Sequence, residues 1–456
     1  MKSYKLLLLI IMVLFIAIAQ AQWLETTIPV GSQPRDLVWN AQNNKVYCAN
    51  QYSNNVTVID GANNTVIKTF YAGNEPYTLA YNPTNSKIYC GTHSTSRQLY
   101  VFNCITDTEI TYLYLGGWCD DLVWNAQNNR VYCTTQSTNS DVVVVDGVTN
   151  SIVATIPSTS PDQIIWNSQN NSVYITCSSG TPRVMVINCY TNGQSVITVG
   201  PFPAALVWNS QNNKVYSANR GSDNVSVINC QTNSVIATIP VGNSPAALTW
   251  NSQNNKVYCA NESTNTVTVI DGQTNSVIRN ITVGNGPKAL VWNAQNNKIY
   301  CANAAGSYPN YDSTVTVIDG QTDSVITTIT VGNGPWAFCW NPLQNRIYVA
   351  NYMSSTISVI RDSILSGIEE NHQPLNADHM SLEVFPNPAK TYFNIHSPLN
   401  AQGSRLRMYD VTGKIVKELE SSGNRELRVS LDGIKNGVYF VRVGNEMVKE
   451  KLVVTR

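Results

Sequence analysis

One loop position recurs eight times in this sequence and carries side chains of very different chemistry. The loop usually ends in proline, and the two residues after it form a pair that can be compared across the copies. Two copies have only alanine in this pair, so the backbone requires no larger side chain there. Departures from alanine are therefore candidates for binding or catalysis. The pairs are Arg35-Asp36, Tyr77-Thr78, Asp120-Asp121, Asp162-Gln163, Ala204-Ala205, Ala246-Ala247, Lys288-Ala289 and Trp336-Ala337.

Three carboxylates in this set suggest a cation site. Asp120, Asp121 and Asp162 could together bind Ca²⁺, because hard cations prefer several carboxylate oxygens. The competing interpretation is three solvated loop carboxylates, and on that interpretation we expect no cofactor.

Aromatic side chains in the same loops could recognise an organic ligand. Tyr77, Trp118 and Trp336 could stack on sugar rings or pack on a peptide, and Phe202 extends the same rim. The competing interpretation is packing within the loops themselves. Together with Arg35, Lys288 and the aspartates, these residues form one candidate binding rim.

A longer loop in the seventh copy is a second candidate for recognition. It contains six extra residues, and Tyr308 and Tyr311 would lie near its exposed tip. A tolerated insertion without a role explains the extra residues equally well.

A regularly spaced marker reveals the elements that position these loops. Successive markers lie 42 or 43 residues apart, except for 48 between the last two. A fixed period of this size indicates stacked repeats or a propeller. The marker is Trp-Asn, with Tyr replacing Trp in the second copy, and its first residues are Trp39, Tyr81, Trp124, Trp166, Trp208, Trp250, Trp292 and Trp340.

Each repeat contains four β-rich runs and no helical pattern. In the sixth copy these runs are Ala247–Trp250, Lys256–Ala260, Thr266–Ile270 and Ser276–Val283. Asn and Gly between them tolerate the positive φ angles of tight turns. Four short antiparallel strands per repeat predict an all-β propeller, with the variable loops together at one mouth of its central channel.

The two ends of the repeat region complement each other. The run Thr26–Gly31 resembles the fourth strand of a repeat, whereas the last repeat stops after Thr356–Ile360, its third strand. The first strand can therefore complete the last blade and remove open sheet edges. We predict eight blades closed in this way, and favour eight over seven.

The repeated phrases also resemble a known family. Tyr-x-Ala-Asn, Val-x-Val-Ile-Asp-Gly-x-Thr-Asn-x-Val and Val-Gly-x-x-Pro closely resemble the YVTN family of β-propeller repeats, over residues 22–362. Members of that family are often seven-bladed, so an eighth blade is a departure. The resemblance implies a surface or exported binding propeller and identifies no ligand.

Composition and the N-terminal residues limit the possible partners. Only 13% of residues are charged, and 29 basic residues balance 29 acidic ones. A neutral surface argues against nucleic acid and anionic membranes. Lys2, Lys5, the apolar run Leu6–Ala19 and a small-x-small ending predict a signal peptide over residues 1–21. We expect no membrane span after its removal.

Eleven cysteines in an exported chain could form disulfides, but their positions argue against a full framework. Five of them occupy the position after the Tyr of Tyr-x-Ala-Asn, where other copies have Ser, Ile or Val. A position that accepts these residues is a small buried one. We predict mostly free thiols, with one or two bridges still open.

The composition changes after the repeats. Residues 363–382 lack periodicity and are expected to form a linker, and residues 383–456 contain short alternating strands typical of a small β-sandwich. The Pro-Asn-Pro opening, the Gly-Val-Tyr-Phe strand and the Lys-rich end resemble the C-terminal sorting domain of the type IX secretion system. This resemblance implies the type IX machinery as a partner, and secretion or display on the outer-membrane surface of a Gram-negative bacterium. An ordinary carbohydrate-binding sandwich is the alternative.

These observations favour an exported or cell-surface propeller, expected to be monomeric, that binds a protein or glycan partner in adhesion, scaffolding or a surface layer. The alternative is a propeller-type enzyme, such as a lactonase, lyase or quinone-dependent dehydrogenase, with carboxylates at the channel mouth. His93 is the only histidine of the repeats, so neither a multi-histidine metal site nor a Ser-His relay is expected. The recurring tryptophans are expected to pack between blades, and no adjacent Cys-Cys pair accompanies them.

Overall fold

The structure is a computed structural model that describes residues 22–137, 140–307, 310–362, 383–385, 389–396, 402–410, 414–422, 426–443 and 449–454. The chain divides into two compact units, Met1–Ile368 and Glu369–Arg456. The signal peptide expected over residues 1–21 and the linker expected over residues 363–382 lie outside the described residues.

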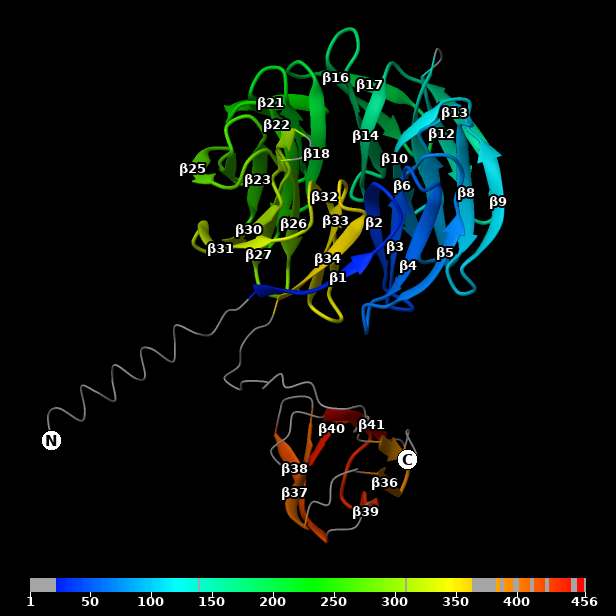
Figure 1. Cartoon of the computed structure of the whole chain (residues 1–456), viewed down its shortest axis with the longest axis vertical. Helices are drawn as coiled ribbons and strands as arrows, with labels where there is room; N and C mark the ends of the chain where they lie inside the picture. The colour runs from blue at the N-terminus through cyan, green and yellow to red at the C-terminus, as the bar shows by residue number, and fades with distance from the viewer. Residues whose placement is uncertain are drawn as a thin grey trace, which may run out of the picture. The chain divides into compact units, whose positions relative to one another are not determined.

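Eight four-stranded antiparallel sheets surround the axis of the first unit, which confirms the predicted eight-bladed propeller (Figure 1). The innermost strands contact one another between adjacent blades. They are β2 (Pro34–Asn40), β6 (Pro76–Asn82), β10 (Trp118–Asn125), β14 (Pro161–Asn167), β18 (Pro203–Asn209), β22 (Pro245–Asn251), β26 (Pro287–Asn293) and β32 (Pro335–Asn341). The second strands are β3 (Lys45–Asn50), β7 (Lys87–Thr92), β11 (Arg130–Gln136), β15 (Ser172–Cys177), β19 (Lys214–Asn219), β23 (Lys256–Asn261), β27 (Lys298–Asn303) and β33 (Arg346–Asn351).

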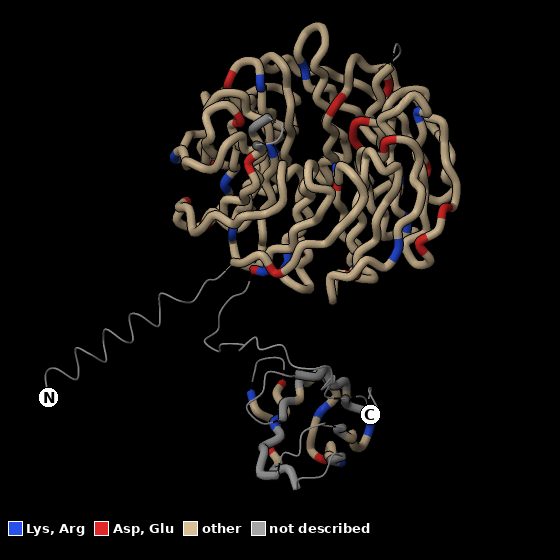
Figure 2. Tube along the Cα trace, in the orientation of Figure 1, with Lys and Arg blue, Asp and Glu red and all other residues tan. Residues whose placement is uncertain are grey.

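The third strand of each blade is largely buried, and the outermost strand is the most exposed. The third strands are β4 (Asn55–Asp60), β8 (Gln98–Asn103), β12 (Asp141–Asp146), β16 (Arg183–Asn188), β20 (Asn224–Asn229), β24 (Thr266–Asp271), β30 (Thr314–Asp319) and β34 (Thr356–Asp362). The outermost strands are β5 (Val66–Tyr71), β9 (Thr108–Tyr114), β13 (Ile152–Pro157), β17 (Gln194–Thr198), β21 (Ser234–Pro240), β25 (Val277–Thr282), β31 (Ser324–Thr330) and, for blade eight, β1 (Gln22–Pro29). Charged residues are sparse along this unit (Figure 2).

The N-terminal strand closes the ring as predicted. Blade eight has the strand order β1-β34-β33-β32, and β1 pairs with β34 from Gln22 opposite Asp362 to Pro29 opposite Thr356. Figure 1 shows the blue β1 beside the yellow β34. Ile28 of this strand is almost fully buried in the core shared by blades eight and one. The strand therefore contributes both edge pairing and apolar burial to closure.

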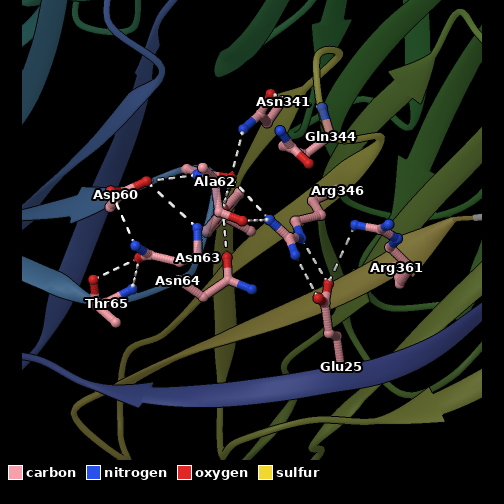
Figure 3. A network of polar contacts seen from close by, with 12 residues as sticks. Glu25, Asp60, Ala62, Asn63, Asn64, Thr65, Asn341, Gln344, Arg346 and Arg361 are labelled. Atoms are coloured by element: carbon pink, nitrogen blue, oxygen red, sulfur yellow. Dashed lines mark hydrogen bonds and ion pairs between the residues drawn. The ribbon is translucent and has the colours of Figure 1, made fainter. Parts of the chain in front are cut away.

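Charged groups join blade eight to blade one at the closing seam (Figure 3). Glu25 of β1 accepts two hydrogen bonds from the Arg346 guanidinium, at 2.6 Å from Nε and 2.5 Å from Nη2. Arg346 Nη1 donates to the carbonyl oxygens of Gly61 and Ala62 in blade one, at 2.9 and 2.7 Å. One buried guanidinium thus joins the first strand, the last blade and the first blade.

Asp362, the last residue of the propeller, forms an ion pair and several hydrogen bonds. The Asp362 carboxylate is fully buried and pairs with Lys298 Nζ at 2.7 Å. Asn293 Nδ2 donates to the same carboxylate at 2.7 Å, and Gln22 Nε2 donates to it at 3.3 Å. Blade seven and the N-terminal strand therefore both contact the end of β34.

A chain of asparagines explains the repeated Asn around the Trp-Asn marker. In seven blades the Asn that ends the innermost strand donates from Nδ2 to the Oδ1 of an Asn in the next blade, at 2.6–2.9 Å. Each acceptor lies in the first hairpin at a φ between 47° and 54°, a conformation that Asn tolerates. Asn341 donates to Asn44 and so completes the circuit.

The chain of asparagines breaks once, and the break predicts a stabilising substitution. Ser86 occupies the acceptor position in blade two at a φ of 51°, and the buried Asn40 Nδ2 has no partner. Ser86→Asn should raise the free energy of unfolding by about 1 kcal/mol, because it supplies the missing acceptor. Urea unfolding would measure this effect. Ser252→Asn in an exposed turn is the control, and equal stabilities of the two variants would contradict the prediction.

The core lies between blades. Leu79 and Ile88 of blade two pack in one cluster with Tyr47 and Val58 of blade one, and the other blade pairs repeat this arrangement. The marker tryptophans also form a hydrogen bond within their own blades. Trp39 Nε1 donates to Asn44 Oδ1 at 3.1 Å, and five further blades repeat this bond. All eleven cysteines are buried and free, whereas the repeat positions predicted mostly free thiols and left one or two bridges open.

The second unit is a small β-sandwich. One sheet contains β35 (Glu383–Phe385), β36 (Tyr392–His396) and β39 (Glu426–Ser430), and the other contains β37 (Gln402–Tyr409), β38 (Ile415–Ser422), β40 (Gly437–Val443) and β41 (Lys449–Val454). Both sheets contribute to one core, in which Phe393 and Val429 meet Met408 and Val441.

Candidate binding site at the channel mouth

A β-bulge at the start of each innermost strand directs the variable residues into the channel. Pro34 pairs with Asn50 and Asp36 pairs with Ala49, so Arg35 lies between them without a partner. The same register shift leaves Tyr77, Asp120, Ala204, Ala246, Lys288 and Trp336 unpaired, and in blade four it covers Asp162 and Gln163. Bulges commonly re-aim side chains at functional sites.

The bulge residues line a cavity of about 370 Å³. Seven of the residues expected at the rim from the sequence lie in its wall: Arg35, Tyr77, Asp120, Asp121, Asp162, Lys288 and Trp336. A second cavity of about 310 Å³ shares Arg35, Lys288 and Trp336 with the first and includes the alanines of blades five and six. The alanines leave open space opposite the larger side chains.

Planar side chains form a continuous stack along one side of the mouth. The Arg35 guanidinium carbon lies 4.4 Å from the Trp336 ring centre and 4.2 Å from that of Tyr77. The Tyr77 ring stacks on His93 at 4.6 Å, and His93 lies 5.3 Å from the Trp118 ring. Arg35 also donates a hydrogen bond to the Tyr77 hydroxyl. These contacts, which we call the stacked wall, hold side chains from blades eight, one, two and three in place.

A charged group of three adjoins the stacked wall, because Lys288 Nζ lies 5.4 Å from the Trp336 ring centre. Glu262 Oε1 pairs with Lys288 Nζ at 2.6 Å, and Glu262 Oε2 pairs with Arg220 Nη2 at 2.5 Å. Arg220 and Lys288 line the cavity. Because two cations share one carboxylate, the group keeps a net positive charge.

Several members of the site were not predicted from the sequence. They follow directly after the second strand of their blades, and the backbone N–H of each donates to the carbonyl oxygen of the residue before the loop proline: His93, Arg220, Glu262 and Tyr352. This position reads Gln51, His93, Gln136, Ser178, Arg220, Glu262, Ala304 and Tyr352 across the copies. Its variability was a detectable signal, and the same comparison between repeats would have found it.

The second residue of each variable pair has a structural explanation. Asp121 accepts hydrogen bonds from Leu122 N at 2.8 Å and from Ile164 N in the next blade at 3.0 Å. Asp36 binds Leu37 N and Leu79 N in the same way, at 2.8 and 2.7 Å. These carboxylates satisfy backbone N–H groups next to the bulges and join neighbouring blades.

Asp120 and Asp162 differ from this pair because they lack backbone donors. The Asp120 side chain is 8% exposed, and its Oδ1 lies 3.2 Å from His93 Nε2. Its Oδ2 is buried without a hydrogen-bond partner. Burial, together with the negative charge of Asp120, raises the pKa of Asp162 to about 6. Arg35 and His93 oppose this rise only in part, so the two carboxylates are poorly compensated on the acidic side of the mouth.

The raised pKa of Asp162 predicts a pH dependence of stability. A carboxyl whose pKa is near 4 when unfolded and about 6 when folded holds its proton more tightly in the folded state. Its contribution to stability is therefore full below pH 4 and is lost as pH rises towards 6. Between pH 4 and 7 the native chain should lose stability relative to Asp162→Asn by an amount on the order of 1 kcal/mol. Urea unfolding at several pH values would measure the free energy of unfolding of both proteins. If that free energy changed with pH in the same way for the native chain and for Asp162→Asn, the assignment would be contradicted.

Two expected site residues, Trp118 and Tyr311, lie apart from the cavity wall. Trp118 is partly exposed at the end of the stacked wall. Tyr311 lies in a two-residue strand, β29 (Asn310–Tyr311), which pairs with β28 (Gly306–Ser307) in the blade-seven insertion. Tyr308 lies outside the described residues. Asp312 ties this insertion to the mouth-side loop by accepting a hydrogen bond from Asn285 N at 2.8 Å.

A cation site at the three aspartates lacks structural support. Neither these carboxylates nor any other set of three or more acidic, histidine or cysteine side chains in the described residues is arranged to hold a metal ion. Both oxygens of Asp121 already accept backbone hydrogen bonds. Within the described part of the chain, no helix is long and apolar enough to span a bilayer.

Comparison with known families agrees with this architecture. Residues 10–299 match the model of the YNCE-like beta-propeller family, which is more than half of the chain. The chain belongs to the YNCE-like beta-propeller family. In this YNCE-like propeller the match ends within blade seven, and the structure continues the same blade design to Asp362. Residues 383–455 match the secretion system C-terminal sorting domain, which implies type IX secretion to the cell surface or exterior.

Solved structures support the fold of this YNCE-like propeller. The β-propeller domain of Cps50 (Swd1) from Myceliophteria thermophila has 8% identity and a TM-score of 0.51, covering 75% of this chain and 100% of that one. The C-terminal WD40 domain of Sif2 has 12% identity and a TM-score of 0.60, covering 75% and 99%. At this identity the likeness concerns the fold alone. The comparison with curated proteins finds no match.

Proposed function

We propose that this chain is a cell-surface or secreted propeller that binds a protein or glycan partner at its channel mouth. The observation that carries the proposal is the cavity of about 370 Å³, whose wall gathers the residues that depart from alanine between repeats. A fold that needs only Ala204 or Ala246 at this position has no structural reason to place Arg35, Asp120 and Trp336 there. A ligand supplies that reason.

The two ends of the chain support a role outside the cell. The sorting domain accounts for passage across an outer membrane, and we infer that residues 1–21 act as a signal peptide for entry into the periplasm. Together they point to a Gram-negative bacterium. The sparse, balanced charge of the propeller favours a specific contact over adsorption to polyanions.

A glycan, peptide and protein array probed with the purified chain tests the binding function. For a partner found in this way, Trp336→Ala should weaken binding by roughly 1–3 kcal/mol, because this aromatic side chain also holds Arg35 in position. Calorimetric titration would measure the change, and circular dichroism would confirm that the variant remains folded.

Ala246→Trp is the matched control for the mouth. It adds the same bulky side chain at the equivalent bulge position of blade six, which borders open space. Folding should tolerate it, and binding should change only if the partner spans the whole mouth. A partner whose affinity survives combined Trp336→Ala, Tyr77→Ala and Asp120→Ala substitution would place the site elsewhere.

The His93–Asp120 contact favours a second candidate function. A carboxylate beside an imidazole, with Asp162 in the same cavity, resembles an acid–base pair of the kind that a lactonase or lyase requires. Assays on lactones and on uronate-containing polysaccharides would test it. Activity that is lost in His93→Ala but retained in Trp336→Ala would favour catalysis over simple binding.

A further inference from the structure

The Arg35 guanidinium lies among aromatic side chains of the two neighbouring blades. The ring centres of Trp336 in blade eight and Tyr77 in blade two are 4.4 and 4.2 Å from its central carbon. Its Nη2 donates a hydrogen bond to the Tyr77 hydroxyl, and no carboxylate in the described residues pairs with it. The remaining N–H donors of its edge are therefore available to a ligand.

An exposed guanidinium edge has a specific chemical preference. Its N–H donors lie in one plane and match the two oxygens of a carboxylate. The two aromatic contacts and the hydrogen bond to Tyr77 hold the guanidinium in place before any ligand arrives, which lowers the entropic cost of binding. The basic end of the site is therefore suited to a planar oxyanion.

The acidic end has the opposite preference. Asp120 is more than nine-tenths buried and lines the cavity, and its Oδ2 is buried without a hydrogen-bond donor. A buried oxygen without a hydrogen bond is costly, and an ammonium group is the donor that would satisfy it best. Asp162 lines the same cavity and adds a second negative charge. His93 contacts only the other oxygen of Asp120.

We infer that the channel mouth binds a small dipolar group that carries both a carboxylate and a primary ammonium, as an amino acid or the end of a peptide does. The carboxylate contacts the edge of Arg35, and the ammonium contacts Asp120 and Asp162. This inference rests on the proposed binding function and specifies its ligand class. The Lys288–Glu262–Arg220 group contains two cations and one carboxylate, and its net positive charge adds to the attraction for the carboxylate of the ligand.

A series of linear amino carboxylates, from glycine to aminohexanoate, tests the inference with the purified chain. Calorimetry or ligand-observed NMR should find one chain length that binds at least about tenfold more tightly than acetate, methylammonium or glucose. Diglycine and its doubly capped derivative form a second arm. Binding of diglycine, but not of the capped derivative, would indicate a peptide end, and preference for a free amino acid would indicate a metabolite.

Two conservative variants separate recognition from folding. Asp120→Asn should remove the preference for amino carboxylates over plain carboxylates, because it keeps the shape and removes the charge. Arg35→Lys should weaken every carboxylate by about tenfold, since an ammonium lacks the planar pair of donors. Glu109→Gln on the exposed outer strand β9 removes the same charge far from the mouth and should change neither ratio.

Three results would overturn the inference. These are the absence of binding by any probe, acetate binding as tightly as the best amino carboxylate, and an unchanged ligand preference in Asp120→Asn. Failure of the inference is distinguishable from failure of the proposed function. If a partner found on the array lacks this charge pair but binds Trp336→Ala more weakly than the native chain, the mouth remains a binding site. Only the ligand class is then rejected.

Discussion

Deletion of residues 22–31 is expected to reduce the free energy of unfolding by at least about 3 kcal/mol. The deletion removes the fourth strand of blade eight and the buried Ile28 side chain. It also leaves the Arg346 guanidinium, whose side chain is 8% exposed, without its Glu25 partner. Urea unfolding followed by tryptophan fluorescence would measure the loss.

Two point variants in the same strand serve as a matched comparison. Ile28→Ala should cost about 2–4 kcal/mol because it opens a cavity in the core between blades eight and one. Leu24→Ser changes a side chain that is 38% exposed and should cost less than about 1 kcal/mol. A deletion variant as stable as the native chain would mean that the ring does not depend on this strand.

Removal of residues 383–456 should abolish delivery outside the cell. The segment matches a sorting domain and forms a separate compact core, so its loss should leave the propeller folded in the periplasm. Fractionation of a bacterium with a type IX system would show the propeller moving almost entirely from the exterior to the periplasm. Thermal unfolding of the periplasmic protein would show an intact transition.

A mouth variant provides the control for this export experiment. Trp336→Ala alters the proposed ligand site but leaves the sorting domain unchanged, so it should reach the exterior in normal amounts. Truncated protein found outside the cell at native levels would show that export depends on another segment.

The repeat made the architecture predictable because one set of interactions occurs in every blade. The marker Asn binds an Asn in the next blade in all blades except the first, and nearly every copy therefore carries the same signal. The clasp was also predictable, since Thr26–Gly31 resembles a strand that the last repeat lacks. The missing acceptor at Ser86 could not be predicted from one repeat alone, because the residue that lacks its hydrogen bond is Asn40 in a different blade.

The site was only partly predictable from the sequence. Comparison of the loop pairs found Arg35, Asp120 and Trp336, because alanine in other copies supplied the reference. It did not separate Asp120 from Asp121, which are adjacent in sequence, although Asp120 lies unpaired in the bulge whereas Asp121 pairs with Thr134. Nor did it find His93, whose contacts with Tyr77 and Asp120 exist only after neighbouring blades meet.

The most direct test of the central claim is a crystal structure of the chain with its array-identified partner bound. We expect atoms of the partner within hydrogen-bonding distance of the Arg35 edge and of Asp120 Oδ2, with the stacked wall unchanged. A partner bound at the blade-seven insertion around Tyr311, or on any other face with the mouth left open, would contradict the account.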